Sequence, residues 1–193
     1  MTSRGTWRAA GRAVAALVAT AALAACGAED AGRDASGSTA PDYAEADIVF
    51  ARAMIPHGQQ GADMSELVLE EKGLEPGVRA LATGIRENQP VETEQLEQWV
   101  AEHGEPVAHE AAHDHGGGED GIATPDQMYA LDEATGPAAQ DLYVEMMIKH
   151  HRGAVVAAQD EVAEGKSPAL VELAGTVLRS REAQLTVLLE AAG

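Results

Sequence analysis

The chain has 193 residues, a formal net charge of −19, 45% hydrophobic residues and only 3% aromatic residues. A chain this acidic offers no basic patch for phosphate groups, which excludes nucleic acid as a partner. The shortage of aromatic residues disfavours a β-sandwich and favours helices. Cys26 is the only cysteine, so disulfides and thiolate metal clusters are excluded as well.

Residues 1–25 are predicted to be a lipoprotein signal peptide. Three arginines form a positive segment, and the alanine-rich apolar run that follows is too short to span a bilayer. The run ends in Leu-Ala-Ala before Cys26, which resembles a bacterial lipobox. The resemblance implies cleavage before Cys26 and lipid attachment there, so that the protein is exported and anchored by the lipid to the outer face of the cell membrane. The alternative is a plain secretory signal with a buried cysteine.

The rest of the chain divides into a tether and one domain. Residues 26–41 are small, polar and turn-rich, which predicts a flexible tether. Residues 42–193 show helical periodicity and form the predicted domain. Without the signal peptide, ten basic residues remain against 32 acidic ones, a net charge of −22. Such a surface attracts cations, but it serves solubility equally well.

Apolar periodicity, caps and helix stops predict long helices over residues 43–72, 76–103, 137–164 and 168–191. Pro56 and Pro90 lie inside the first two and predict a bend or a broken turn. Thr124-Pro125 is a cap signal that opens a short helix, and residues 104–123 form a histidine-rich loop. The predicted fold class is all-α: a ferritin-like four-helix bundle with one long crossover.

A weak internal repeat relates the two halves of the domain. Residues 50–58 (FARAMIPHG) match residues 143–151 (YVEMMIKHH) at an offset of 93. The second and fourth long helices also match weakly, with Ile85, Gln89, Glu92, Leu96 and Trp99 corresponding to Val177, Arg181, Gln184, Leu188 and Ala191. The bundle is therefore predicted to consist of two repeated helical hairpins.

Both copies of the repeat place methionine and histidine on one helix face, because these residues recur at helical spacing. If the copies face each other, thioether and imidazole donors converge, and that donor set suits copper best, with other transition metals as alternatives. The competing interpretation is that the methionines fill the core and the histidines are hydrogen-bonded structural residues. The candidate ligands on the helices are Met54, His57, Met64, Met147, His150 and His151.

The loop supplies a second candidate metal site. His109, His113 and His115 stand close together beside three glycines. Short flexible histidine-rich segments bind Cu(II), Ni or Zn loosely. The alternative is a solvated linker.

These motifs resemble the bacterial family known as domain of unknown function 305, whose repeat reads roughly Met-Ile-Pro-His-His followed by a later Met. The resemblance rests on both repeat copies, on Gln89 and Trp99, and on Thr124-Pro125-Asp-Gln-Met. It implies a ferritin-like helical fold, export, and copper binding in some members. Gly58 replaces the second histidine of the first copy, and Ala157 replaces the closing methionine of the second, which puts a symmetric site in doubt.

The predicted function is extracytoplasmic copper sequestration or transfer by a lipid-anchored protein that is not an enzyme. The alternative is a structural or adaptor bundle with methionine and histidine as core residues. A di-iron oxidase is disfavoured, because the only Glu-x-x-His motif, Glu110 to His113, lies in the loop. A homodimer and the identity of partner proteins stay open.

Overall fold

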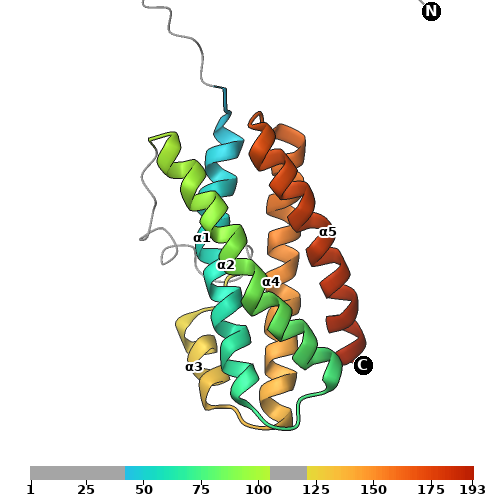
Figure 1. Cartoon of the computed structure of the whole chain (residues 1–193). Coiled ribbons are helices and arrows are strands. Elements are labelled where there is room, and N and C mark those ends of the chain that lie inside the picture. Colours follow the sequence, from blue (N-terminus) through green and yellow to red (C-terminus); the bar gives the residue numbers. More distant parts are fainter. Residues whose placement is uncertain (1–41, 105–120) are drawn as a thin grey trace, which may run out of the picture. The chain divides into compact units, whose positions relative to one another are not determined.

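The computed structural model describes residues 42–104 and 121–193, and these form helices joined by short connections (Figure 1). The all-helical prediction is confirmed for the described residues. The predicted signal peptide and tether, Cys26, His109, His113 and His115 lie outside them. The helices are α1 (Glu45–Glu70), α2 (Pro76–Glu102), α3 (Pro125–Glu133), α4 (Pro137–Glu164) and α5 (Pro168–Ala191).

The helix ends follow the predicted signals closely. Thr124 caps α3: its hydroxyl accepts from the Gln127 backbone N–H at 3.2 Å, and the Gln127 side chain accepts from the Thr124 N–H at 2.8 Å. Ser167 precedes α5 as predicted, but its side chain makes no capping hydrogen bond. Both α1 and α2 continue past their internal prolines, so neither contains the broken turn that was one of the two expectations.

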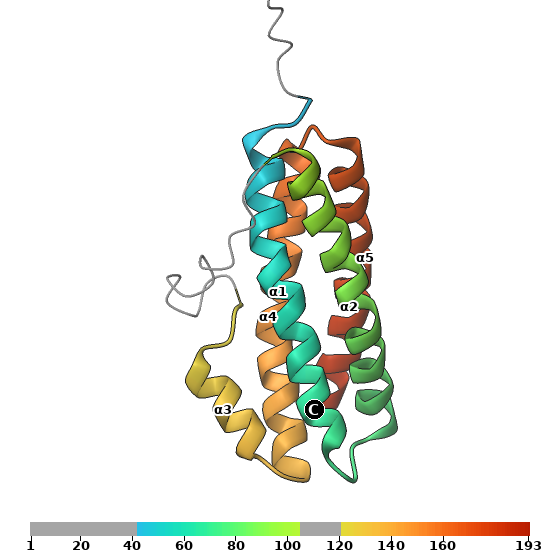
Figure 2. The same ribbon diagram turned by 60° about the vertical axis from the view of Figure 1, so that its left-hand side comes forward.

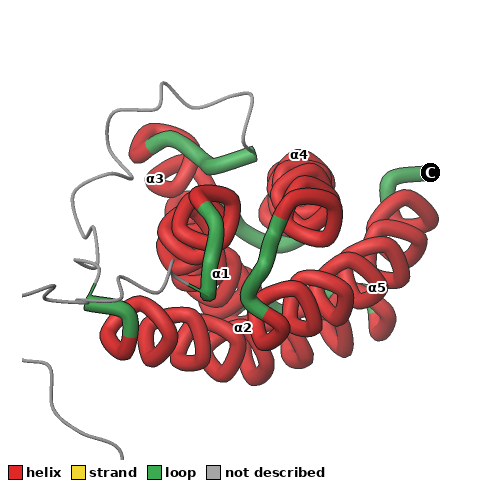
Figure 3. The backbone as a smooth tube through the Cα atoms, turned by 90° about the horizontal axis from the view of Figure 1, so that it is seen from above, coloured by secondary structure: helices red, strands yellow, loops and turns green. Residues whose placement is uncertain are grey.

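The long helices form two antiparallel hairpins, α1 with α2 and α4 with α5 (Figure 2). Seen from above, α1 and α4 form one layer, and α2 and α5 form the other (Figure 3). The sequence colours show that α1 and α4 run in opposite directions (Figure 2). The short helix α3 packs on the outside of α1 and α4, where the long crossover reaches them.

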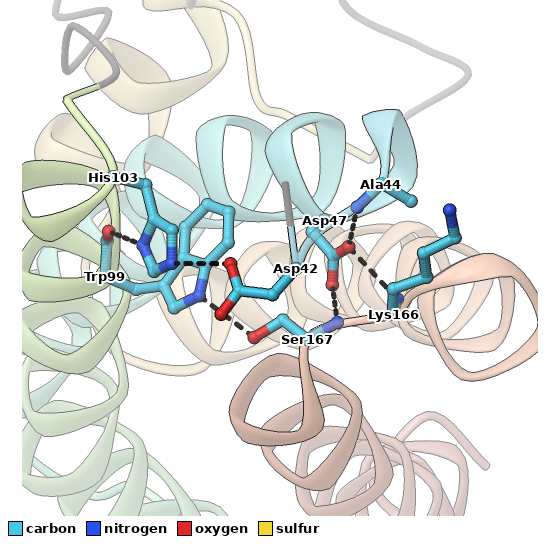
Figure 4. A network of polar contacts seen from close by, with 7 residues as sticks. All are labelled: Asp42, Ala44, Asp47, Trp99, His103, Lys166 and Ser167. Carbon is cyan, nitrogen blue, oxygen red and sulfur yellow. Dashed lines mark hydrogen bonds and ion pairs between the residues drawn. The ribbon is translucent and has the colours of Figure 1, made fainter. Parts of the chain in front are cut away.

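One end of the bundle is held together by Asp47 of α1, as Figure 4 shows. Its carboxylate accepts backbone N–H groups from Ala44 at 2.5 Å, Lys166 at 3.0 Å and Ser167 at 2.8 Å. The Ser167 hydroxyl accepts in turn from the indole N–H of Trp99 at 3.0 Å. These bonds join α1, α2 and the α4–α5 turn, and they explain why Ser167 does not cap its own helix.

The core consists of two apolar clusters with polar residues between them. The buried members of the first apolar cluster are Phe50, Ala51, Met54, Ile55, Leu96, Trp99, Val100, Ala154, Ala158, Leu170, Ala174 and Val177. The buried members of the second apolar cluster are Met64, Val68, Leu74, Val78, Ala82, Ile85, Leu131, Tyr143, Val144, Met146, Met147 and Leu188. On every long helix the buried side chains between the two clusters are polar. We call this set the polar layer: His57, Gln89, Glu92, Thr93, His150, His151, Arg181 and Gln184.

Six of these eight residues are buried, and Glu92 and Gln184 are half-buried. Burying polar groups in a helical core is unfavourable unless they find partners, and apolar residues would stabilise the bundle more simply. Departures of this kind from core-packing rules are expected at functional sites. The polar layer is therefore where a function of the bundle should be sought.

No helix in the described part of the chain is both long enough and apolar enough to cross a membrane.

Candidate metal centre

His57 of α1 and His150 of α4 meet in the polar layer. Their ring centroids lie 3.7 Å apart with an interplanar angle of 27°, so the imidazoles are stacked face to face. The exposed fractions are 4% for His57 and 0% for His150. The predicted meeting of the two repeat copies is thus seen for this histidine pair.

Burial keeps His150 and His151 of the layer neutral. Desolvation lowers the pKa of His150 well below its usual value, and the neighbouring imidazoles and Arg181 add to the effect. Desolvation also lowers the pKa of His151 to about 3, with the Arg181 charge as a further cause. Neutral imidazole carries a lone pair on one nitrogen, which is the form that binds metal.

His151 faces away from the stack and toward α5. Its ring centroid is 6.2 Å from that of His150, and its Nε2 lies 2.7 Å from the Gln184 side-chain oxygen. That oxygen also accepts from Arg181 at 3.4 Å, and Arg181 forms an ion pair with Glu92 of α2. One chain of polar contacts thus links α4, α5 and α2 through the layer.

The methionines do not converge on one point. Met54 belongs to the first apolar cluster, whereas Met64 and Met147 belong to the second. Antiparallel packing of α1 on α4 explains the division, because it places the equivalent methionines of the two repeat copies, Met54 and Met147, on opposite sides of the histidine stack. The structure therefore does not bring all six candidate helix ligands to one point. Met64 and Met147 share one side, and Ala157, where the family has a methionine, packs beside Met54 on the other.

Packing against α2 explains why position 58 is glycine rather than histidine. A Cβ atom built on Gly58 would lie 2.4 Å from the Thr93 hydroxyl, and one built on Gly61 would lie 2.0 Å from the Gln89 amide oxygen. The two glycines let α2 side chains enter the polar layer. A larger residue at position 58 would displace Thr93, so this chain fills that space from α2 instead.

Residues 121–123 pass over the histidine pair between α1 and α4. The Gln60 side chain donates to the Ala123 carbonyl at 2.9 Å and accepts from the Ala123 N–H at 2.7 Å, which fixes the segment on α1. Gly121 lies against α4 with φ +80, and a Cβ there would be 2.5 Å from the Lys149 carbonyl oxygen and 3.0 Å from the His150 Cα. The close approach and the positive φ together require glycine.

Replacing Gly121 with alanine should lower the free energy of unfolding by about 3 kcal/mol, because it adds a backbone clash to a left-handed conformation. Gly73 has φ +82 and open space around its Cβ position, so Gly73→Ala should cost only about 1 kcal/mol. Urea denaturation of both variants measures the difference. Equal losses would show that residues 121–123 do not pack tightly on α4.

The stacked rings limit what the site can bind in this arrangement. A metal lies in the plane of an imidazole at about 2 Å from its nitrogen, so two stacked rings cannot share one ion. One ring must turn before both histidines bind the same ion. Among the described residues, no three His, Cys, Asp or Glu side chains form a metal-binding group.

The comparisons identify the family of this chain. The family model "Domain of unknown function (DUF305)" matches residues 47–192, which is most of the chain and all four long helices. The chain belongs to the DUF305 family. A search of curated proteins found no match.

Solved structures support this family assignment. A DUF305 fragment from Deinococcus radiodurans is 22% identical, with a TM-score of 0.71 over 79% of this chain and 99% of that one. A DUF305 protein of Streptomyces coelicolor, named as a candidate secreted protein, is 28% identical, with a TM-score of 0.68 over 76% and 89%. CopM in its Cu(I)-bound form is 25% identical, with a TM-score of 0.62 over 75% and 93%. CopM has also been solved with Cu(II) and with silver.

The contacts that hold the histidines of this DUF305 chain were not predicted from the sequence. Arg181, Glu92 and Gln184 were matched only as weak repeat positions, and Gln60 and Gly121 were not singled out. One signal pointed to Arg181: a charged residue at helical spacing among the buried positions Leu170, Ala174, Val177 and Leu188 of α5. No sequence pattern marks the contact of Gln60 with Ala123.

Proposed function

We propose that this protein binds copper outside the cytoplasm and stores it or hands it on, using imidazole and thioether ligands from α1 and α4. The observation that carries the proposal is the pair of buried histidines in a polar layer that otherwise weakens the core. His150 and His151 are neutral, and Met64 and Met147 lie in the adjacent apolar cluster. Nitrogen and thioether donors of this kind favour Cu(I) over hard cations.

The polar atoms of the layer fit such an ion. The backbone groups of Gly121 and Met147 approach the His150 and His151 rings, but neither ring nitrogen of His150, nor Nδ1 of His151, makes a hydrogen bond of ordinary geometry to a described residue. Buried nitrogens without such bonds are costly, and a metal ion would satisfy them. The copper- and silver-bound forms of CopM, at 25% identity, support binding of the same class of metal ion.

The proposal places the metal on one side of the histidine stack. Met64 and Met147 are both fully buried there, whereas Met54 on the other side has near it only Ala157, which stands where the repeat would place the counterpart of Met64. The first copy therefore supplies Met64 and the second supplies Met147. A one-sided centre suits a single Cu(I) ion better than a symmetric pair.

The protein would act outside the cytoplasm as a lipid-anchored bundle built from two repeats. Lipid on Cys26 would anchor the domain at the outer face of the membrane, and the candidate secreted relative supports export. The two hairpins would be repeats in a ferritin-like bundle, which the pairing of α1 with α2 and α4 with α5 supports. The role is binding without catalysis.

The His57→Ala/His150→Ala variant should lose Cu(I) affinity by at least about 100-fold, because loss of a residue that only supports a ligand already costs about 10- to 100-fold and this variant removes two ligands. Competition against a chromogenic Cu(I) chelator under reducing conditions measures this. Met64→Leu should weaken binding and Met54→Leu should leave it nearly unchanged, because only Met64 lies on the proposed side.

His103→Ala is the matched control, since His103 stacks on Trp99 at the end of the bundle with ring centroids 4.2 Å apart. A variant with alanine at 109, 113 and 115 tests the loop. If binding survives the loss of both layer histidines and disappears with the loop, copper binds at the loop. If no variant or native protein binds, the bundle is structural.

A further inference from the structure

Gln184 is held in one orientation by its neighbour on α5. Arg181 is 1% exposed, and its Nη2 forms an ion pair with Glu92 across the α2–α5 contact. Its Nη1 lies 3.4 Å from the Gln184 side-chain atom assigned as oxygen. A guanidinium can only donate hydrogen bonds, so the Gln184 atom that faces it is the oxygen. The Gln184 amide therefore has only one orientation that suits its neighbours.

The same oxygen decides which nitrogen of His151 carries the proton. It lies 2.7 Å from His151 Nε2, and an amide oxygen only accepts. Nε2 therefore donates its N–H to Gln184. The Met147 backbone also approaches the His151 ring, but Nδ1 makes no hydrogen bond of ordinary geometry with it. The Gln184 contact at Nε2 has ordinary geometry, so the single proton of the neutral ring lies on Nε2 and Nδ1 keeps its lone pair.

We propose that Gln184, oriented by the Arg181–Glu92 ion pair, is a positioning residue that fixes His151 as the Nε2–H tautomer and keeps the Nδ1 lone pair free for a metal. Partners of this kind, which hold the second nitrogen of a ligand histidine, set ring orientation and donor strength. The tautomer follows from the polar contacts alone. The assignment of Nδ1 as a metal-binding atom rests on the proposed function.

The test begins with the metal-free, full-length protein labelled with ¹⁵N-histidine. Long-range ¹H–¹⁵N spectra distinguish the two tautomers by their nitrogen shifts, and a His151→Gln sample assigns the signals. The expected result is Nε2–H in the native protein and a mixture of tautomers in Gln184→Met, which keeps the side-chain length but cannot accept. Gln184→Glu should restore Nε2–H, because a carboxylate also accepts. Gln98→Met is the control, since Gln98 is exposed on α2 and bonds only to Glu102 among the described residues.

Silver(I) affinity, measured on the same variants, is the second readout. Gln184→Met should weaken binding by about 10-fold or more, and Gln184→Glu should recover it. A native Nδ1–H tautomer, directed at the Met147 carbonyl one turn earlier, would overturn the inference, as would a tautomer that Gln184→Met leaves unchanged. If the tautomer behaves as expected and no variant or native protein binds silver or Cu(I), the positioning role stands and the proposed function fails.

Discussion

Replacing Arg181 with methionine should lower the free energy of unfolding by roughly 3 kcal/mol, which is the lower end of the range for a broken buried ion pair. The reason is that Glu92 would keep its charge in the polar layer without a counter-charge. We expect a loss at the lower end of this range because the Glu92 side chain is still 18% exposed and keeps some contact with water. Urea denaturation at neutral pH measures the loss.

The double variant Arg181→Met/Glu92→Met separates this effect from simple loss of packing. Replacing both partners with apolar residues removes the unpaired charge, so most of the lost stability should return. If the single and double variants are equally destabilised, the ion pair does not hold the layer together, and packing of the arginine stem explains the loss. Silver(I) binding by the double variant should still be weak, because Gln184 would have lost its orienting donor.

Stability should fall as the pH rises from about 5 to 8, because of Glu161 on α4. Its side chain is 1% exposed, and burial raises its pKa to about 8, with the hydrogen bond and charge of Asp47 as further causes. Burial also raises the pKa of Asp47, but three backbone N–H donors outweigh this, so that pKa is lowered overall. The pair therefore shares one proton, and Glu161 carries it.

Stability falls with rising pH because the folded protein binds one more proton than the unfolded chain in this range. Between the unfolded value of 4.5 and about 8, the folded protein holds a proton on Glu161 that the unfolded chain releases. The contribution is complete below the unfolded pKa and is lost as the pH rises through the folded one, at up to about 1.4 kcal/mol per pH unit. Asp47 acts in the opposite direction and loses its contribution in acid. The most stable range should be mildly acidic.

Glu161→Gln tests this directly, because glutamine mimics the protonated acid and cannot titrate. The variant should show little pH dependence between 5 and 8 and should be more stable than the native protein at pH 8. Glu164→Gln, one turn later on the exposed face of α4, is the control and should keep the native slope. A flat native profile, or a slope that Glu161→Gln retains, would contradict the shared proton.

Local sequence signals were sufficient to predict the helices but not the arrangement of the candidate metal centre. Pro137 and Pro168 at the starts of α4 and α5, with Gly165 between them, define those helices to the residue, because caps and prolines act within one turn. The face with Met147, His150 and His151 is buried as the 3.6-residue period requires. The stacking of His57 on His150 follows from the repeat only after the two hairpins are assumed to face each other.

Contacts between residues on different helices could not be predicted from the sequence. Gln89 and Glu92 were matched with Arg181 and Gln184 as repeat positions, yet nothing local shows that they meet in one layer. The division of Met54 from Met64 depends on the antiparallel direction of α1 and α4, which no pattern within one helix reports. Residues 121–123 reach His150 only because the crossover returns to the middle of the bundle.

The most direct test of a metal centre in the polar layer is a crystal structure of the protein loaded with silver(I), which stands in for Cu(I). The silver ion is located by its anomalous scattering. The expected result is one silver ion between α1 and α4, bonded to a layer histidine and to Met64 or Met147, with the stack of His57 on His150 opened. Silver bound only near His109 to His115, or no silver within the bundle, would contradict a metal centre in the polar layer.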